Sequence, residues 1–562
     1  MSNLIKDASA QVREILLNAL GRLVAEGSVP AEPIPDFLVE IPNDVSHGDF
    51  ASNAAMVCAR AFRLPPRRIA ELICGQAVLD GTFFERTEVA GPGFINFFLG
   101  RRWFSMVVDS VLCEGSGYGR TDTGAGKKIL VEFVSANPTG PMHIGNARGG
   151  AIGDCLASVL SWAGYEVARE FYVNDAGNQI NKFALSLEVR YLQLYKEGIE
   201  LPEDAYQGAD ITEHAAHFAK LHGDKYVEAS QEERREALVA YALPLNIQGL
   251  ERDLLQYRIQ YDRWFRESTL HDNGEVGKTI ELLKEKGQTY EQDGALWLKA
   301  EALGADKDFV LVRSNGVPTY IVPDIAYHYN KLVTRGYDRA VNVLGADHHG
   351  YVFRLKAALT AIGVDASRLD VVLMQMVRLV RDGEPVKASK RSGKAITLVT
   401  LLEEVPIDAA RFFFNLREAN SHFDFDLGLA IEQSSQNPVY YVQYAHARIC
   451  SILTNLASDG VTAGKLSAQD YDVLSAPEEI ELIRHLASFP AEIDEAARTY
   501  EPSRITRYGM ELATKFHKFY SVCRVKGEEA GLQQARIALC TSVKTALENL
   551  SEILKITCPD SM

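Results

Sequence analysis

The sequence lacks the features of a membrane or secreted protein. No stretch approaches the ~18 consecutive apolar residues that span a bilayer, and the first 20 residues mix charges into an amphipathic helical pattern rather than a signal peptide. The 8 cysteines are scattered along the chain without a CxxC pair, a pattern typical of a reduced cytosolic protein and unlike a zinc ribbon. We therefore expect a cytoplasmic protein with no membrane segment, no metal-binding residues and no structural zinc.

Positive charge is also in short supply. The chain has 59 Lys and Arg against 75 Asp and Glu, a formal net charge of −16. This deficit argues against a general polyanion binder, although it leaves room for a local basic groove on an acidic body. With 562 residues and 47% hydrophobic content, the chain is long enough for three or four packed domains.

Changes in the hydrophobic pattern divide the chain into four regions. Residues 1–117 mix helical periodicity with a hairpin signal around GPG (91–93), which indicates an α/β domain. Residues 118–400 alternate buried strands and helices, as in a parallel Rossmann-like α/β sheet. We read 190–300 as a helical insertion with no strand that continues this sheet. Beyond about residue 400 we expect the chain to be almost wholly helical, with a connecting stem (401–435) that leads to an all-α region (436–562).

The segment ANPTGPMHIGN (136–146) lies between a predicted strand and a predicted helix. Prolines and glycines fix an abrupt turn, and the helix N-terminus behind it favours a phosphate. His143 and Asn146 can donate hydrogen bonds to phosphate oxygens, and the small residues at 145, 147, 149 and 150 would let a planar base approach the backbone. An ordinary tight turn with a satisfied histidine is the alternative.

A second segment, VKASKRSGKAITL (386–398), is strongly basic. It crowds Lys387, Lys390, Arg391 and Lys394 among serine and glycine residues in an otherwise acidic chain. Such a loop can close over a triphosphate and neutralise a pyrophosphate leaving group. A solvated run of charge is the alternative.

HIGN (143–146) and KASKR (387–391) together resemble the HIGH and KMSKS motifs of class I aminoacyl-tRNA synthetases, with Ala388 and Arg391 departing from the second motif. Further stretches resemble bacterial arginyl-tRNA synthetases. Those in the catalytic and anticodon regions are 131–154, 320–332 and 437–449; those near the termini are 40–56, 89–99 and 500–520. The resemblance therefore covers nearly the whole chain.

This resemblance implies that ATP and L-arginine form arginyl-adenylate and diphosphate, after which the arginyl group passes to tRNA(Arg). Magnesium would accompany ATP. The N-terminal domain would grip the tRNA body, and 436–562 would bind the anticodon. We expect a monomer. The implied catalytic residues are His143, Asn146, Lys387 and Lys390; the implied ATP-binding residues are Pro138, Gly140, His143, Gly145, Asn146, Asp347, Ser389 and Lys390.

The family's arginine-binding positions correspond here to Glu132, Asn137, Tyr320 and Asp324. We add His348, from a loop that in related enzymes touches the adenosine and the amino acid. Carboxylates suit the planar, permanently charged guanidinium, and the four-residue spacing of Tyr320 and Asp324 lets both face the same way on a helix. Asp324 could instead be a helix N-cap. Some members carry Gln where His348 stands, and that histidine could belong to a hydrogen-bonded turn.

Two helical stretches supply candidate tRNA contacts. We expect tRNA to contact Tyr440, Tyr444, Arg448, Arg504, Tyr508 and Lys515, because tyrosines can stack on unpaired bases and cations can meet phosphates. Core packing or an ordinary solvated flank is the alternative for each. Two rival functions are a class I synthetase for another amino acid and a catalytically inactive RNA-binding paralogue.

Overall fold

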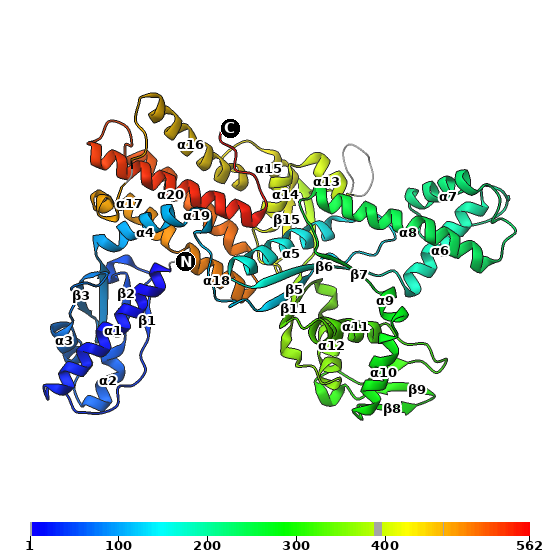
Figure 1. Cartoon of the computed structure of the whole chain (residues 1–562), viewed down its shortest axis with the longest axis horizontal. Coiled ribbons are helices and arrows are strands. Elements are labelled where there is room, and N and C mark those ends of the chain that lie inside the picture. Colours follow the sequence, from blue (N-terminus) through cyan, green and yellow to red (C-terminus); the bar gives the residue numbers. More distant parts are fainter. Residues whose placement is uncertain (1–2, 387–395, 465) are drawn as a thin grey trace.

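The computed structural model describes residues 3–386, 396–464 and 466–562. The N-terminal domain lies to one side of the molecule, below the C-terminal helices in Figure 1. Its antiparallel sheet has the order β1-β2-β4-β3, and the predicted hairpin is confirmed as β3 and β4. The elements are α1 (Leu4–Ala25), β1 (Val39–Glu40), β2 (Phe50–Ser52), α2 (Ala54–Phe62), α3 (Pro66–Gln76), β3 (Phe84–Ala90), β4 (Phe94–Leu99) and α4 (Arg101–Glu114).

A five-stranded parallel sheet forms the centre of the molecule, with the order β12-β11-β5-β6-β7. The first strand in sequence, β5, lies in the middle of the sheet. Strands β6 and β7 follow on one side of it, and β11 and β12 lie on the other side. The order therefore reverses between β5 and β11, and ligands bind at the carboxyl ends of such neighbouring strands. The strands are β5 (Lys128–Glu132), β6 (Glu166–Val173), β7 (Arg263–Arg266), β11 (Arg339–Gly345) and β12 (Leu369–Met374).

The interpretation of 190–300 as a wholly helical insertion is wrong. Strand β7 pairs in parallel with β6 and continues the main sheet. Beyond it, β8 and β9 join β10 in a separate antiparallel sheet. Strand β7 has only four residues, RWFR, and only one of their side chains is fully buried. So short a hydrophobic pattern cannot be distinguished in the sequence from the charged helices around it. This region contains α6 (Gly177–Leu192), α7 (Ala209–His222), α8 (Gln231–Gln256), α9 (Ser268–Asp272), α10 (Glu275–Glu285), β8 (Thr289–Gln292), β9 (Ala295–Leu298) and β10 (Phe309–Val312).

The remaining elements of the central region connect the sheet to the C-terminal helices. Strand β13 pairs with β15 in parallel, so the chain beyond about residue 400, which we expected to be almost wholly helical, contributes one short strand. The elements are α11 (Ile321–Tyr329), α12 (His349–Ala361), β13 (Val377–Arg381), β14 (Glu384–Pro385), α13 (Leu398–Glu404), α14 (Ile407–Phe414), β15 (Phe423–Asp426) and α15 (Leu427–Ile431).

The C-terminal domain is a bundle of long helices that reaches back over the catalytic region (Figure 1). The completely buried Arg411 of α14 links this bundle to the catalytic region. Its guanidinium donates to the Leu554 carbonyl at 2.8 Å, to the Tyr257 carbonyl at 2.9 Å and to the Asp154 carboxylate of α5 at 2.6 Å. The bundle therefore packs firmly on α5. Its helices are α16 (Pro438–Ser458), α17 (Pro477–Ala487), α18 (Phe489–Thr499), α19 (Ser503–Val522) and α20 (Ala530–Leu554), and α5 spans Ile144–Trp162.

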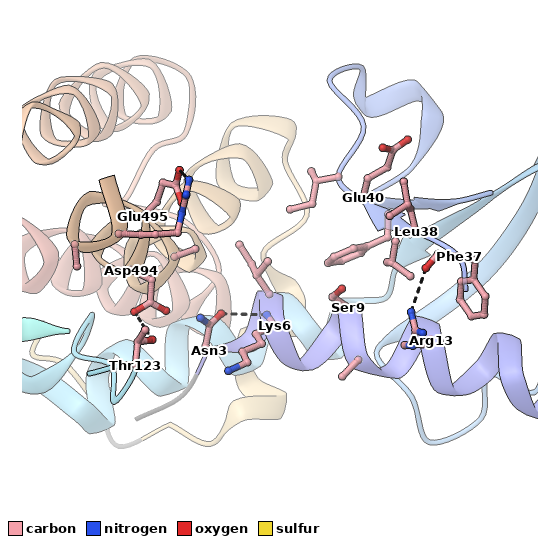
Figure 2. A pocket seen from close by; sticks show the side chains of 18 of the residues that line it. Asn3, Lys6, Ser9, Arg13, Phe37, Leu38, Glu40, Thr123, Asp494 and Glu495 are labelled. Atoms are coloured by element: carbon pink, nitrogen blue, oxygen red, sulfur yellow. Dashed lines mark hydrogen bonds and ion pairs between the residues drawn. The ribbon is translucent and has the colours of Figure 1, made fainter. Parts of the chain in front are cut away.

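A cleft of about 840 Å³ separates the N-terminal domain from the body. Figure 2 shows α1 with Lys6 and Arg13 in this cleft, and on the side of the body Thr123 donates to Asp494 of α18 at 2.8 Å. Its lining mixes Lys6 and Arg13 with Asp36 and acidic residues of α18. None of the predicted site residues lines this cleft. Over the described ranges, no helix is both long and apolar enough to cross a membrane.

Candidate active site

The loop between β5 and α5 is held in an uncommon backbone conformation. Val134 and Ser135, neither of them glycine, have positive φ angles of 69° and 39°. Left-handed backbone at a β-branched residue is costly, and such strain clusters at functional sites. The preceding Phe133 fits against Gly153 of α5, where an added Cβ would lie 2.3 Å from the phenylalanine ring. The turn is therefore fixed by packing at its base.

Helix α5 begins immediately behind this loop. His143 is the N-cap and its side chain is exposed, which disfavours the alternative of a histidine satisfied in a tight turn. The Asn146 side-chain oxygen accepts a hydrogen bond from the His143 backbone N–H at 3.0 Å. The free N–H groups of the first helical turn point toward the loop, as an anion-binding helix start requires.

The four small residues of α5 do not share one role. A Cβ at Gly145 would meet open space, whereas one at Gly149 would contact Met374 and one at Gly150 would lie 2.8 Å from Ile259. Ala147, Gly149 and Gly150 are buried. The expectation that a base lies against all four is therefore corrected: only the first turn, at Gly145, is open to a ligand.

The end of the basic loop lies beside the start of α5. Thr397 forms an isolated antiparallel bridge with His143, and the Leu398 N–H donates to the Met142 carbonyl at 2.9 Å. The residues that follow the second motif therefore lie against the first motif, which is more than 240 residues away in the sequence. Lys387, Ser389 and Lys390 lie outside the described residues, so their predicted roles rest on the sequence.

The loop after β11 leaves the same edge of the sheet as the loop after β5, because the two strands are parallel neighbours. It forms a short 3₁₀ turn, Ala346–His348. The side chains of Asp347 and His348 are 84% and 52% exposed, and their nearest charged atoms are 4.0 Å apart. Both side chains are therefore open to a ligand at this edge.

Glu132 ends β5 inside a buried polar network. Its carboxylate pairs with the fully buried Lys331 at 2.5 Å and accepts from the Ser135 hydroxyl at 2.9 Å. The Lys331 ammonium also donates to Asn342 at 3.2 Å. Part of the charge of Glu132 is thus neutralised within the protein, and the strained Ser135 helps to orient it.

Asp324 lies in the first turn of α11, whose N-cap is Tyr320, so the alternative of Asp324 as the cap is excluded. Its carboxylate accepts a hydrogen bond from the Tyr351 hydroxyl, and the Tyr320 and Tyr351 rings lie 5.9 Å apart. Tyr351 therefore lies near both residues, and their common direction toward a ligand stays a prediction. Burial, with the nearby charges of Glu132 and Glu267, raises the pKa of Asp324 to about 7.

The remaining predicted arginine ligands are open to solvent. Tyr320 is 68% exposed, and Asn137 is exposed in the loop after β5. Sequence reasoning missed Glu267, which follows β7 and accepts from the Tyr172 hydroxyl at 2.9 Å. The sequence could have indicated Glu267 only as an acidic residue that follows a strand, and strand β7 was not predicted.

Three predicted tRNA contacts come together in the C-terminal domain. Tyr440, Tyr444 and Arg448 line a pocket of about 440 Å³ between α16 and α19, together with Tyr441 and His517, which sequence reasoning missed. The Tyr440 and Tyr444 rings are parallel within 6° at 6.3 Å. Burial and the charge of Arg448 lower the pKa of His517 to about 4, so a neutral aromatic wall faces this cation.

The other three predicted contacts lie elsewhere on α19. Tyr508 is 2% exposed and stacks on His485 and Phe489 at 4.4 and 4.8 Å. It belongs to the core, so its prediction as a base-stacking residue is wrong. Arg504 pairs with Glu492 of α18 at 3.0 Å. Burial, together with the charge of Lys515, lowers the pKa of His485 to about 4. Neither Arg504 nor Lys515 lines the pocket between α16 and α19.

Among the residues that the structure describes, one group of possible metal ligands lies away from the sheet. The ligand atoms of His446, Cys450 and Asp560 lie within 4.8 Å of one another. His446 Nδ1 lies 2.9 Å from the Pro559 carbonyl, and the Cys450 thiol donates to Asp560 at 3.3 Å. These bonds hold the chain's last residues against α16. The expected absence of structural zinc stays a prediction.

Known proteins share this organisation. Three family models match: "Arginyl tRNA synthetase N terminal domain" at residues 10–99, "tRNA synthetases class I (R), catalytic domain" at 107–426, and "DALR anticodon binding domain" at 442–562. Together with the parallel sheet, these matches define a class I aminoacyl-tRNA synthetase.

Full-length relatives identify the family within this class. The chain is 54% identical to the arginine–tRNA ligase of Caldanaerobacter subterraneus and 51% identical to that of Acetivibrio thermocellus, each over 100% of both chains. The solved structure of Thermus thermophilus arginyl-tRNA synthetase has the same fold, with a TM-score of 0.72 and 23% identity over 97% of this chain and 99% of that one. The chain belongs to the arginyl-tRNA synthetase family, the arginine–tRNA ligases, which confirms the predicted fold class and function.

Proposed function

We propose that the chain forms arginyl-adenylate at the carboxyl edge of the parallel sheet, where β5 and β11 are neighbours. The observation that carries this proposal is the bridge between His143 and Thr397, which places the segment that follows the second motif against the first motif. A nucleotide phosphate fits the start of α5, and the arginine side chain fits the acidic side.

The roles follow from charge and position. The arginine carboxylate attacks the α-phosphorus of ATP, a bond to phosphorus forms, and the bond to the diphosphate leaving group breaks. No protein nucleophile is needed, so catalysis consists of positioning and charge stabilisation. His143 and Asn146 would hold the phosphates with Pro138, Gly140 and Gly145 shaping the turn. Magnesium would accompany ATP as a counterion of its phosphates.

The other ATP and arginine contacts come from neighbouring loops. Asp347 would contact the adenosine, and Lys387, Ser389 and Lys390 the leaving group. Asp324 and Glu132 would hold the guanidinium, with Tyr320, Asn137 and His348 around the rest of the amino acid. A neutral isostere such as citrulline would leave the carboxylates without a cation, which supplies discrimination in a single step.

In the second step the arginyl group moves from the adenylate to a ribose hydroxyl of tRNA(Arg), and AMP leaves. The pocket of Tyr440, Tyr444 and Arg448 suits an unpaired base, because two parallel rings offer stacking surface and the cation offers charge. We assign tRNA-body binding to 1–117, catalysis to 118–400, a stem to 401–435 and anticodon binding to 436–562. We further propose a cytoplasmic monomer.

Replacing Lys390 with alanine tests the loop's role. Adenylate formation, measured as ATP–diphosphate exchange with arginine and tRNA present, should slow by about 100- to 1,000-fold, since one group that stabilises developing charge contributes about 2.7–4 kcal/mol. The affinity for tRNA should stay within about twofold. Lys307→Ala, which removes an exposed lysine far from the loop in sequence, is the control for the loss of one positive charge. Unchanged exchange in Lys390→Ala would exclude the loop from catalysis.

A further inference from the structure

We propose that Asn246 is a positioning residue for the ATP-binding turn, by which we mean the segment 136–142 in front of α5. Asn246 lies on α8, between β6 and β7 in the sequence, and its side-chain amide donates to the Pro138 carbonyl at 2.9 Å. This inference rests on the proposed function, which places the ATP phosphates at the start of α5. It gives the helices between β6 and β7 a part in that site.

The ATP-binding turn has little hydrogen bonding of its own. Its two prolines have no backbone N–H to donate, and among the described residues no hydrogen bond joins two members of the turn. Two hydrogen bonds reach its backbone from outside. The Leu398 N–H donates to the Met142 carbonyl at 2.9 Å, next to α5, and Asn246 holds the middle of the turn at Pro138. Because Pro138 is buried, loss of the second bond there is costly.

The neighbouring helix α7 fixes the orientation of the Asn246 amide. Nε2 of His214 lies 2.7 Å from the side-chain oxygen of Asn246, so the histidine donates to that oxygen and the amide nitrogen is left to face Pro138. Helix α7 also approaches the turn at a second point, because a Cβ on Gly140 would lie 3.9 Å from a carboxylate oxygen of Asp210. The two helices therefore lie against the turn at both Pro138 and Gly140.

A purely structural role, in which Asn246 only joins α8 to α7, is the competing explanation. The two explanations differ for an aspartate at this position, which has the same shape as asparagine. Its carboxylate still accepts from His214, but it cannot donate to Pro138 and sets a negative charge against that carbonyl. If Asn246 only joins the helices, the aspartate is harmless and removing either partner has the same consequence. If Asn246 holds the turn, the aspartate displaces it.

The test compares three variants of the full-length enzyme in ATP–diphosphate exchange with arginine and tRNA present. Asn246→Ala should lower kcat/KM for ATP by about 10- to 100-fold, because a small displacement of a positioning segment is costly to the rate. Asn246→Asp should lose at least as much. His214→Ala should lose less than about threefold, and the KM for tRNA should stay within about twofold in all three. Gln248→Ala, at an exposed position of α8, is the matched control and should behave as the unsubstituted enzyme.

The outcomes separate this inference from the proposed function. A harmless Asn246→Asp, or equal losses in Asn246→Ala and His214→Ala, would overturn the positioning role. Normal ATP kinetics in Asn246→Ala has the same meaning, provided that His143→Ala slows the exchange. If His143→Ala also leaves the exchange unchanged, the proposed ATP site itself is wrong. If Asn246→Ala does not fold, as judged by thermal unfolding, Asn246→Asp and His214→Ala decide: a loss confined to Asn246→Asp supports the role, and equal or absent losses refute it.

Discussion

Replacing Asp324 with asparagine isolates the contribution of one carboxylate to arginine recognition. The two side chains have the same size, and the asparagine oxygen can still accept from the Tyr351 hydroxyl that now bonds Asp324. The substitution also removes repulsion from the charges of Glu132 and Glu267, which raise the pKa of Asp324 in the absence of arginine. We therefore expect the variant to fold normally, as judged by thermal unfolding, and to lose affinity for the cation.

The size of the loss follows from the charge that disappears. Removing one partner of a desolvated charge pair costs about 2–5 kcal/mol, and each 1.36 kcal/mol is tenfold. We expect kcat/KM for arginine to fall by about 30- to 5,000-fold in ATP–diphosphate exchange with tRNA present. The KM for ATP should change by less than about threefold, because ATP meets other residues. Similar losses for both substrates would refute the assignment.

The same carboxylate gives a dependence on pH. Because the pKa of Asp324 is raised to about 7, the free enzyme holds a proton there at mildly acidic pH, and a guanidinium must displace it. The arginine KM should fall as the pH rises from about 6 to 8, and Asp324→Asn should flatten this slope. An acid with a raised pKa in the folded state also makes folding less favourable as pH rises from about 4 through about 7. If the arginine KM depended on pH equally in the unsubstituted enzyme and in Asp324→Asn, this account would be contradicted.

Two further predictions concern packing and tRNA. Gly153→Ala should lower the free energy of unfolding by about 1–3 kcal/mol, because its Cβ would meet the Phe133 ring at 2.3 Å. Gly145→Ala, whose Cβ would face open space, is the matched control in thermal unfolding. Equal stability of the two variants would show that the Cβ at position 153 causes no destabilising clash. Tyr444→Ala should raise the KM for tRNA in aminoacylation by about 5- to 150-fold, from about 1–3 kcal/mol of lost stacking, with the arginine KM unchanged. Tyr195→Ala, an exposed tyrosine of the helical insertion, is its control, and an equal effect there would argue against a base-binding pocket.

Long periodic segments and abrupt turns were predictable from the sequence because local physics decides them. The apolar stripe of α1 (Val12, Ile15, Leu16, Ala19 and Leu23) is buried as its spacing requires. The turn around His143 likewise follows from prolines and glycines between a strand and a helix. The family resemblance then added the arginine positions, of which Asp324 lies beside two further carboxylates.

Features that depend on contacts distant in sequence were not predictable in this way. Strand β7 is too short to be periodic, and its identity comes from pairing with β6. Glu267 was missed with it. Tyr508 lies on a basic helix whose pattern fits either stacking or burial, and the packing of α17 and α18 buries it. His517 joins the tyrosine pocket only because α19 crosses α16.

The most direct test is a crystal structure of the enzyme with a non-hydrolysable arginyl-adenylate analogue. The account predicts the phosphate at the start of α5 near His143 and the guanidinium in contact with Asp324. A phosphate bound away from that helix, or a guanidinium on a surface without these acidic side chains, would contradict it.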